Sequence, residues 1–300
     1  MTTLRNCTAV LAFLALAAIP SAARPSGLKH EASIYIDEKE EALRLPEGVA
    51  CGDKGAIVVA DTGNGRLLTF AWRDGKLTGG TAVRLAEATH PVRVQVDSKG
   101  NVLVLDRRSR RIVRVDTAGR FAGAVEWRGA TGASGIAPIA FKLDAADNLY
   151  VLDVVARRVI VSDAGGKVSR DLPLPRGETE FTDVWVDSAG RILAVDSVGS
   201  RLWAAEAGSK EFKPLGGSLK DRVSFPVYLT GAEGKLYLVD QNGNGIAVLT
   251  GDGGFLGREL DMGWLDGKVY YPAQVCVNAE GYLFVADRAN NRVQVFSLSR

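Results

Sequence analysis

Residues 286–296 read Ala286-Asp287-Arg288-Ala289-Asn290-Asn291-Arg292-Val293-Gln294-Val295-Phe296. An apolar strand ends at Asp287, a polar turn follows, and Arg292 opens another strand with alternating side chains. The strand that ends in aspartate recurs every 43 to 47 residues, at Asp61, Asp106, Asp153, Asp196, Asp240 and Asp287. A period of this length built from strands is typical of β-propeller blades, because helical repeats would instead space apolar residues at 3.6-residue intervals.

The repeat unit can be followed on both sides of its aspartate. About fifteen residues earlier comes a proline that opens a first strand, at Pro46, Pro91, Pro138, Pro226 and Pro272, with Phe181 in the fourth unit. Five residues later an arginine opens a third strand, except in the fifth unit, which has Gly245. The first two strands and the short turn between them form a tight hairpin.

Residues 60–67 (ADTGNGRL) and 286–296 resemble NHL repeats. The resemblance extends over essentially the whole chain after its N-terminal segment, and it implies an all-β, six-bladed propeller with four strands in each blade. Propellers of this family include scaffolds, RNA binders and enzymes, so the resemblance indicates the fold more than the role.

The ends of the chain predict how the ring closes. The sixth unit reaches Arg300 after three strands, and residues 32–37 alternate apolar and polar side chains before the first repeat. We expect residues 32–37 to complete the last blade, since an open sheet edge would leave backbone groups unpaired. Residues 24–300 are thus predicted to form one propeller domain, with its six repeats over about 43–300.

The first 23 residues have the pattern of a cleaved export signal. Arg5 precedes an apolar run over residues 10–19, and small residues follow up to Ala23. The apolar run is shorter than the roughly 20 residues that a transmembrane helix needs, and no later run is longer. We expect an exported, periplasmic or extracellular protein without a membrane span.

Composition and charge agree with a soluble globular chain. It is 46% hydrophobic and 24% charged, and 37 Lys and Arg against 35 Asp and Glu leave a net charge of +2. This near-neutral balance and the export signal argue against a nucleic-acid partner. We expect a monomer that binds a protein or glycan.

Two cysteines, Cys51 and Cys276, follow the export signal on the first strands of units one and six, which meet at the ring seam. An oxidising compartment permits a bridge between them, and two free buried thiols are the alternative. The spacing of about 10 Å between stacked sheets argues against a bridge.

The aspartate and arginine of each repeat are predicted to order loops rather than to catalyse, since they recur once per blade instead of converging on one point. These structural positions are Asp61 with Arg66, Asp106 with Arg111, Asp153 with Arg158, Asp196 with Arg201, and Asp287 with Arg292. The densest basic segment contains Arg107, Arg108 and Arg110, and is either a solvated loop or an edge that holds an anionic partner.

Two patterns raise the question of a metal. Asp240, Asn242 and Asn244 match the front of a calcium loop, although Gly251 stands where such a loop needs a bidentate glutamate. The other pattern lies where first strands begin, which is the channel mouth in enzymatic propellers: Glu47, Arg93, Thr182, Asp183, Tyr228 and Gln274.

The lactonase and regucalcin propellers bind a divalent metal through a glutamate at such a position. Residues 45–48 resemble that segment, which would make Glu47 a metal ligand or base with Asp183 as its acidic partner. The asparagine ligands of that family are not visible at equivalent positions. A zinc site with three histidines, as in the related amidating lyase, is excluded because the chain has two histidines.

The sequence therefore favours an exported, non-enzymatic binding propeller without a cofactor. The alternative is a lactonase-like hydrolase that depends on calcium or another divalent cation.

Overall fold

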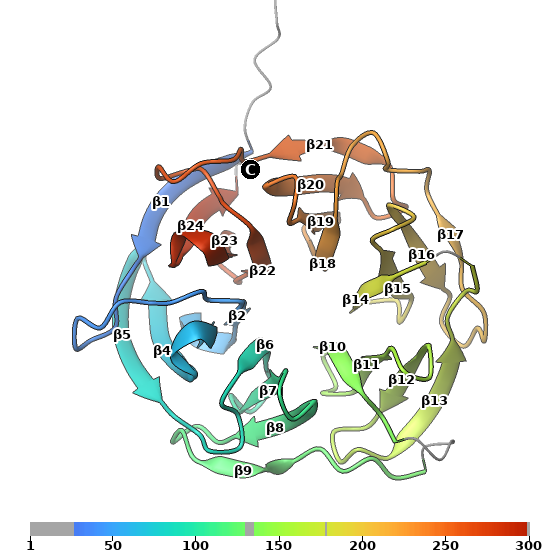
Figure 1. Cartoon of the computed structure of the whole chain (residues 1–300), viewed down its shortest axis with the longest axis horizontal. Helices are drawn as coiled ribbons and strands as arrows, with labels where there is room; N and C mark the ends of the chain where they lie inside the picture. Colours follow the sequence, from blue (N-terminus) through green and yellow to red (C-terminus); the bar gives the residue numbers. More distant parts are fainter. Residues whose placement is uncertain (1–26, 130–134, 178, 299–300) are drawn as a thin grey trace, which may run out of the picture.

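The computed structural model describes residues 27–129, 135–177 and 179–298, so the predicted export signal lies outside the described residues. Six four-stranded antiparallel sheets stand around a central axis like the blades of a propeller (Figure 1). The predicted fold class is confirmed. Within the described residues, no helix is long and apolar enough to cross a membrane.

Each blade runs outward from the axis in chain order. Blade 1 contains β2 (Gly48–Cys51), β3 (Ala56–Asp61), β4 (Arg66–Arg73) and β5 (Lys76–Val83). Blade 2 contains β6 (Pro91–Val96), β7 (Val102–Asp106), β8 (Arg111–Val115) and β9 (Phe121–Ala124). Blade 3 contains β10 (Pro138–Leu143), β11 (Leu149–Asp153), β12 (Arg158–Ser162) and β13 (Val168–Pro173). Blade 4 contains β14 (Phe181–Val186), β15 (Ile192–Asp196), β16 (Arg201–Ala205) and β17 (Lys213–Leu215). Blade 5 contains β18 (Pro226–Ala232), β19 (Lys235–Asp240), β20 (Gly245–Thr250) and β21 (Phe255–Glu259). Blade 6 contains β22 (Pro272–Val277), β23 (Tyr282–Asp287), β24 (Arg292–Leu298) and β1 (Leu28–Ile34). Three short 3₁₀ turns complete the elements: η1 (Asp53–Gly55), η2 (Thr62–Asn64) and η3 (Arg288–Asn290).

The N-terminal strand closes the last blade, because β1 pairs antiparallel with β24. Its bounds differ from the predicted residues 32–37. The strand begins earlier, and the chain leaves the sheet after Ile34 because the Asp37 carboxylate accepts hydrogen bonds from the backbone N–H groups of Lys39 and Glu41. These bonds fold residues 37–41 into a turn.

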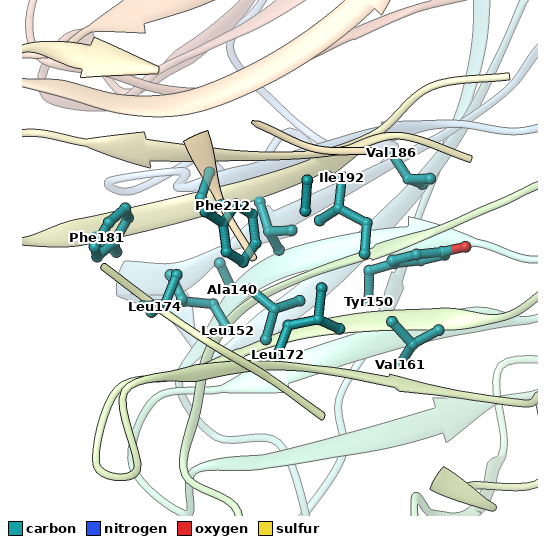
Figure 2. Packing of buried hydrophobic residues seen from close by; sticks show 14 residues of the cluster. Ala140, Tyr150, Leu152, Val161, Leu172, Leu174, Phe181, Val186, Ile192 and Phe212 are labelled. Carbon is teal, nitrogen blue, oxygen red and sulfur yellow. The ribbon is translucent and has the colours of Figure 1, made fainter. Parts of the chain in front are cut away.

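The hydrophobic core lies between neighbouring blades rather than at the centre of the ring. Between blades 3 and 4, Leu152 and Leu172 belong to the same buried cluster as Phe181 and Ile192 (Figure 2). The second strand of each blade is buried on both faces, which explains its continuous apolar run.

Blades 1, 2 and 6 are joined around the axis by a side chain and a disulfide. Gln274 of β22 donates to the Val94 carbonyl of β6 at 2.8 Å, and Gly48 of β2 leaves the space that this reach requires. Cys51 and Cys276 form a disulfide with their Cα atoms 5.7 Å apart. The expectation against this bridge was wrong, because β2 and β22 are innermost strands, where neighbouring blades converge to less than the usual spacing of stacked sheets.

Candidate functional site

A cavity of about 540 Å³ opens where the six innermost strands begin. We call it the mouth cavity. Every blade contributes to its lining. Residues at the starts of the innermost strands are Glu47, Val92, Arg93, Pro138, Ile139, Thr182, Val227 and Ala273. Residues from the loops that follow the repeated aspartates are Arg107, Arg110, Val154, Val155 and Gln241. Another cavity, of about 440 Å³, lies where the innermost strands end and includes Cys51, Gln95 and Val277.

Irregular pairing at the strand starts helps to build the mouth cavity. The innermost strands of blades 2 to 6 each show a register shift just after their first residue. Such a bulge reorients side chains locally. Neighbouring residues, such as Val92 and Arg93, therefore both reach the cavity although they would point to opposite faces of a regular strand.

The mouth cavity is lined by arginines and one carboxylate. Both oxygens of Glu47 bind the Arg107 guanidinium, at 3.1 and 2.5 Å, and Arg288 lies 3.3 Å from the same carboxylate. Arg93 donates to the Val227 carbonyl at 3.0 Å and lies over the Tyr228 ring. Arg110 is exposed, and its guanidinium forms no bond with another described residue. The cavity thus combines an excess of positive charge with apolar walls.

Below the mouth cavity, the channel is filled by a buried ion pair. Lys142 Nζ lies 3.2 Å from the Asp183 carboxylate, and both side chains are fully buried. The Leu229 N–H donates to the same carboxylate at 2.8 Å, and the Lys142 ammonium packs against the face of the Tyr228 ring. Burial lowers the pKa of Lys142 to about 7, against the opposing effect of Asp183, and burial also raises the pKa of Tyr228.

The structure divides the predicted mouth residues into two groups. Glu47, Arg93 and Thr182 line the mouth cavity. Asp183, Tyr228 and Gln274 do not: they are buried at 0%, 3% and 0% exposure and bind other parts of the channel wall. These three residues have the same position in their strands as Arg93, so strand position alone does not separate the two groups. What separates them is that each of the three makes contacts inside the channel.

Sequence reasoning missed Lys142. This residue lies four positions after Pro138, and Asp183 lies two positions after Phe181, so both have the parity that faces the channel. These positions mark Lys142 and Asp183 as charged residues of innermost strands, whereas their pairing and the depth of Lys142 depend on the bulge in β10. In the densest basic segment of the sequence, Arg107 and Arg110 line the mouth cavity. Arg108 is exposed and does not line it.

The repeated aspartates order loops, but the predicted arginine pairing holds in only part of the ring. Arg66, Arg158 and Arg292 bind the aspartates of their own repeats at 2.7, 3.0 and 2.7 Å. Arg111 instead binds Glu126.

Two aspartates show why the pairing fails. Asp106 already accepts the backbone N–H groups of His90 and Ser109. No ion pair joins Arg201 to Asp196 among the described residues, and the Trp203 indole lies 3.5 Å from that carboxylate instead.

The proposed calcium loop is held together by protein groups. Arg258 binds Asp240 at 2.8 Å, and the Asn244 side chain accepts the Tyr271 N–H and donates to the Asn242 carbonyl. An arginine on the leading carboxylate disfavours a cation at the same place. In the part of the chain that the structure describes, no three His, Cys, Asp or Glu side chains gather into a metal-binding group.

Solved structures of other proteins resemble this chain closely in fold but only weakly in sequence. A virginiamycin B lyase from Staphylococcus aureus superposes with a TM-score of 0.64 and 14% identity, over 89% of this chain and 98% of that one. A gluconolactonase from Xanthomonas campestris gives 0.63 and 15%, over 88% of each chain.

A 31-residue stretch is 64% identical to the E3 ubiquitin-protein ligase TRIM71 of Xenopus tropicalis, but it covers 10% of this chain and 4% of that protein. This chain therefore matches only a small part of that relative. The NHL repeat family model matches residues 43–70 and 269–296, the first and last repeats of the ring. The chain is therefore a β-propeller of six four-stranded blades that carries NHL repeats at its first and last blades.

Proposed function

We propose that this protein is an exported, non-enzymatic binding propeller whose mouth cavity holds an acidic segment of a protein or glycan partner. The main support is the positive charge of the mouth cavity. Arg93 and Arg110 have no carboxylate partner among the described residues. The carboxylate that lines the cavity, Glu47, is already bound by Arg107 and Arg288. Guanidinium groups beside apolar walls suit a carboxylate carried on an apolar body.

Export is supported by the disulfide. Bridges such as Cys51–Cys276 persist in oxidising compartments and are rare in the cytosol. Together with the sequence pattern of residues 1–23, this supports a periplasmic or extracellular location.

The lactonase-like alternative has weaker support from the site. Propellers of similar shape include a lyase and gluconolactonases, but likeness at 13 to 17% identity concerns the fold. A divalent cation needs several free oxygen ligands. Here Glu47 is occupied by two arginines and Asp183 by Lys142.

Binding of a labelled acidic peptide that contains Glu and Leu residues, measured by fluorescence anisotropy, tests the proposal. Arg110→Glu should weaken binding at least about tenfold, since a hydrogen bond to a charged group contributes about 1.5–3 kcal/mol. Lys99→Glu makes the same charge change in the β6–β7 turn, at the other end of the channel, and should leave binding unchanged.

The proposal fails if the peptide does not bind or if both variants weaken binding equally. Stoichiometric divalent metal in protein purified without chelators, together with lactone hydrolysis lost in Glu47→Ala, would support the hydrolase instead.

A further inference from the structure

The segment that joins β21 to β22 carries exposed apolar side chains. Figure 1 shows the course of its backbone. We call residues 261–271 the aromatic loop. Its Trp264 is 81% exposed, Leu265 65% and Met262 63%, and Tyr270 and Tyr271 follow toward β22. Large apolar side chains gathered in this way mark interaction surfaces rather than ordinary solvent-facing positions.

The aromatic loop is held firmly by the last repeat. Arg292, paired with Asp287, donates to the carbonyls of Leu265 and Lys268 at 2.8 and 2.9 Å. Asn290 donates to the Gly263 carbonyl at 2.8 Å, and Gln294 donates to the Lys268 carbonyl. The loop therefore presents Trp264 at a fixed position, which reduces the conformational entropy that binding would cost.

The surroundings of the aromatic loop are acidic. Asp261 is 83% exposed and forms an ion pair with the partly exposed Lys268 across 3.7 Å. Asp266 of the loop accepts a hydrogen bond from Tyr35 and pairs with the buried Arg292. Exposed Glu38, Glu40 and Glu41 follow Tyr35 in the chain with one exposed lysine, Lys39, among them, and Glu41 pairs with the buried Arg66. Carboxylates therefore outnumber lysines among these exposed side chains. This negative charge disfavours an anionic membrane as the surface that Trp264 contacts.

The aromatic loop and the mouth cavity share one face of the ring. The loop leads into Pro272 at the start of β22, and Tyr270 and Tyr271 bond to the loops that follow the repeated aspartates. The same face thus carries an acidic aromatic surface at the seam of blades 6 and 1, and a basic apolar cavity extended by Arg107 and Arg110 of blade 2.

We infer that this face binds a second copy of the same chain. This inference rests on the proposed function, because it identifies the acidic partner segment as the aromatic loop of the other copy. In a two-fold dimer with these faces in contact, each Trp264 enters the mouth cavity of the other copy, and each Asp261 approaches Arg107 and Arg110 of the other copy.

A two-fold axis in the plane of the face, midway between loop and cavity, brings both contacts together at once. The cavity supplies apolar walls that include Ile139 and Val155, and arginines that stack on an indole. The inference replaces the monomer that we expected from the sequence.

The dimer can be tested by sedimentation equilibrium of the disulfide-bonded protein. Protein concentrations from about 1 to about 200 µM at low salt cover the range in which interfaces of modest strength associate. The wild type should shift from monomer to dimer. Trp264→Ser, Arg110→Glu and Asp261→Lys should each weaken association at least about tenfold. Leu256→Ser removes an apolar side chain of 55% exposure on the outer strand β21, so its association constant should stay unchanged.

Charge reversal gives a sharper test. A mixture of Arg110→Glu and Asp261→Lys chains should form heterodimers better than either variant forms homodimers, because both contacts then pair opposite charges. A monomeric wild type throughout the range overturns the inference, as does a dimer that Trp264→Ser and Arg110→Glu leave intact.

Two other outcomes separate this inference from the proposed function. Peptide binding that needs Arg110, in a protein that stays monomeric, would keep the proposed function and refute the dimer. Trp264-dependent sedimentation of monomers with phosphatidylcholine vesicles would assign the aromatic loop to a lipid surface and also refute it.

Discussion

Lys142 places an ammonium group in the interior of the channel, where water cannot solvate it. Its neighbours there are the Asp183 carboxylate, the rings of Tyr228 and Trp185, and the guanidinium of Arg93, which adds unfavourable positive charge. A buried pair of this kind costs desolvation that its mutual attraction offsets only in part. The lowered pKa of Lys142 reports this cost.

The pH dependence of stability follows from that pKa. Below about pH 7 Lys142 is protonated in the folded and unfolded chains, so the burial cost is constant. Between about 7 and the ordinary value of 10.5, the unfolded chain binds more protons, and Lys142 therefore makes the free energy of unfolding rise with pH. Lys142→Met should remove this rise in urea unfolding measured from pH 6 to pH 9.5, whereas the exposed Lys99→Met should keep it. Equal slopes in wild type and Lys142→Met would contradict the assignment.

Gly48 provides a steric test of the contact between blades. A Cβ atom there would lie 2.9 Å from the Ala60 Cβ and 3.3 Å from the Gln274 Oε1. Gly48→Val should displace the Gln274 amide from Val94 and lower the free energy of unfolding by about 2–4 kcal/mol, from overpacking and a lost buried hydrogen bond. Gly217→Val is the control, because no atom lies within 4 Å of its Cβ position. A similar stability of both variants would show that the gap at Gly48 is not needed.

At the scale of elements, the aspartate–arginine pairs are unequal in what they hold. Arg292 is buried and ties Asp287 to the aromatic loop, whereas no ion pair joins Arg201 to Asp196 among the described residues. Arg292→Ala should lower the free energy of unfolding by about 3–5 kcal/mol because it leaves Asp287 buried without its partner. Arg201→Ala should change it by no more than about 0.5 kcal/mol. Urea unfolding of both variants measures the difference, and equal losses would mean that the pairs are equivalent.

The elements also show what the sequence can predict. The spacing of the repeated aspartates predicted six blades, and the missing fourth strand of the last unit predicted closure by the N-terminal segment; both depend on local patterns. The pairing of Glu47 with Arg107 joins residues of different blades, and the depth of Lys142 depends on a bulge in β10. Neither is visible without the distances that the fold creates.

For the whole molecule, ring closure is the structural problem, because the first and last blades must be held together. β1 closes blade 6 by pairing with β24, and the hydrogen bond of Gln274 to Val94 reaches across blade 1. The disulfide adds a covalent link between β2 and β22, over a sequence separation of 225 residues. A link that closes so long a loop restricts the unfolded chain more than the folded ring.

The double variant Cys51→Ala/Cys276→Ala should therefore fold into the same propeller, with an unchanged far-ultraviolet circular dichroism spectrum, because β1 still closes the ring. Its free energy of unfolding should fall by about 2–4 kcal/mol, since the unfolded chain regains the entropy of an open loop. Reduction with dithiothreitol should lower the urea midpoint of the wild type to that of the double variant, and it should leave the midpoint of the double variant unchanged. If reduction left the wild-type midpoint in place, the noncovalent contacts at the seam would be sufficient, and the stabilisation assigned to the disulfide would be wrong.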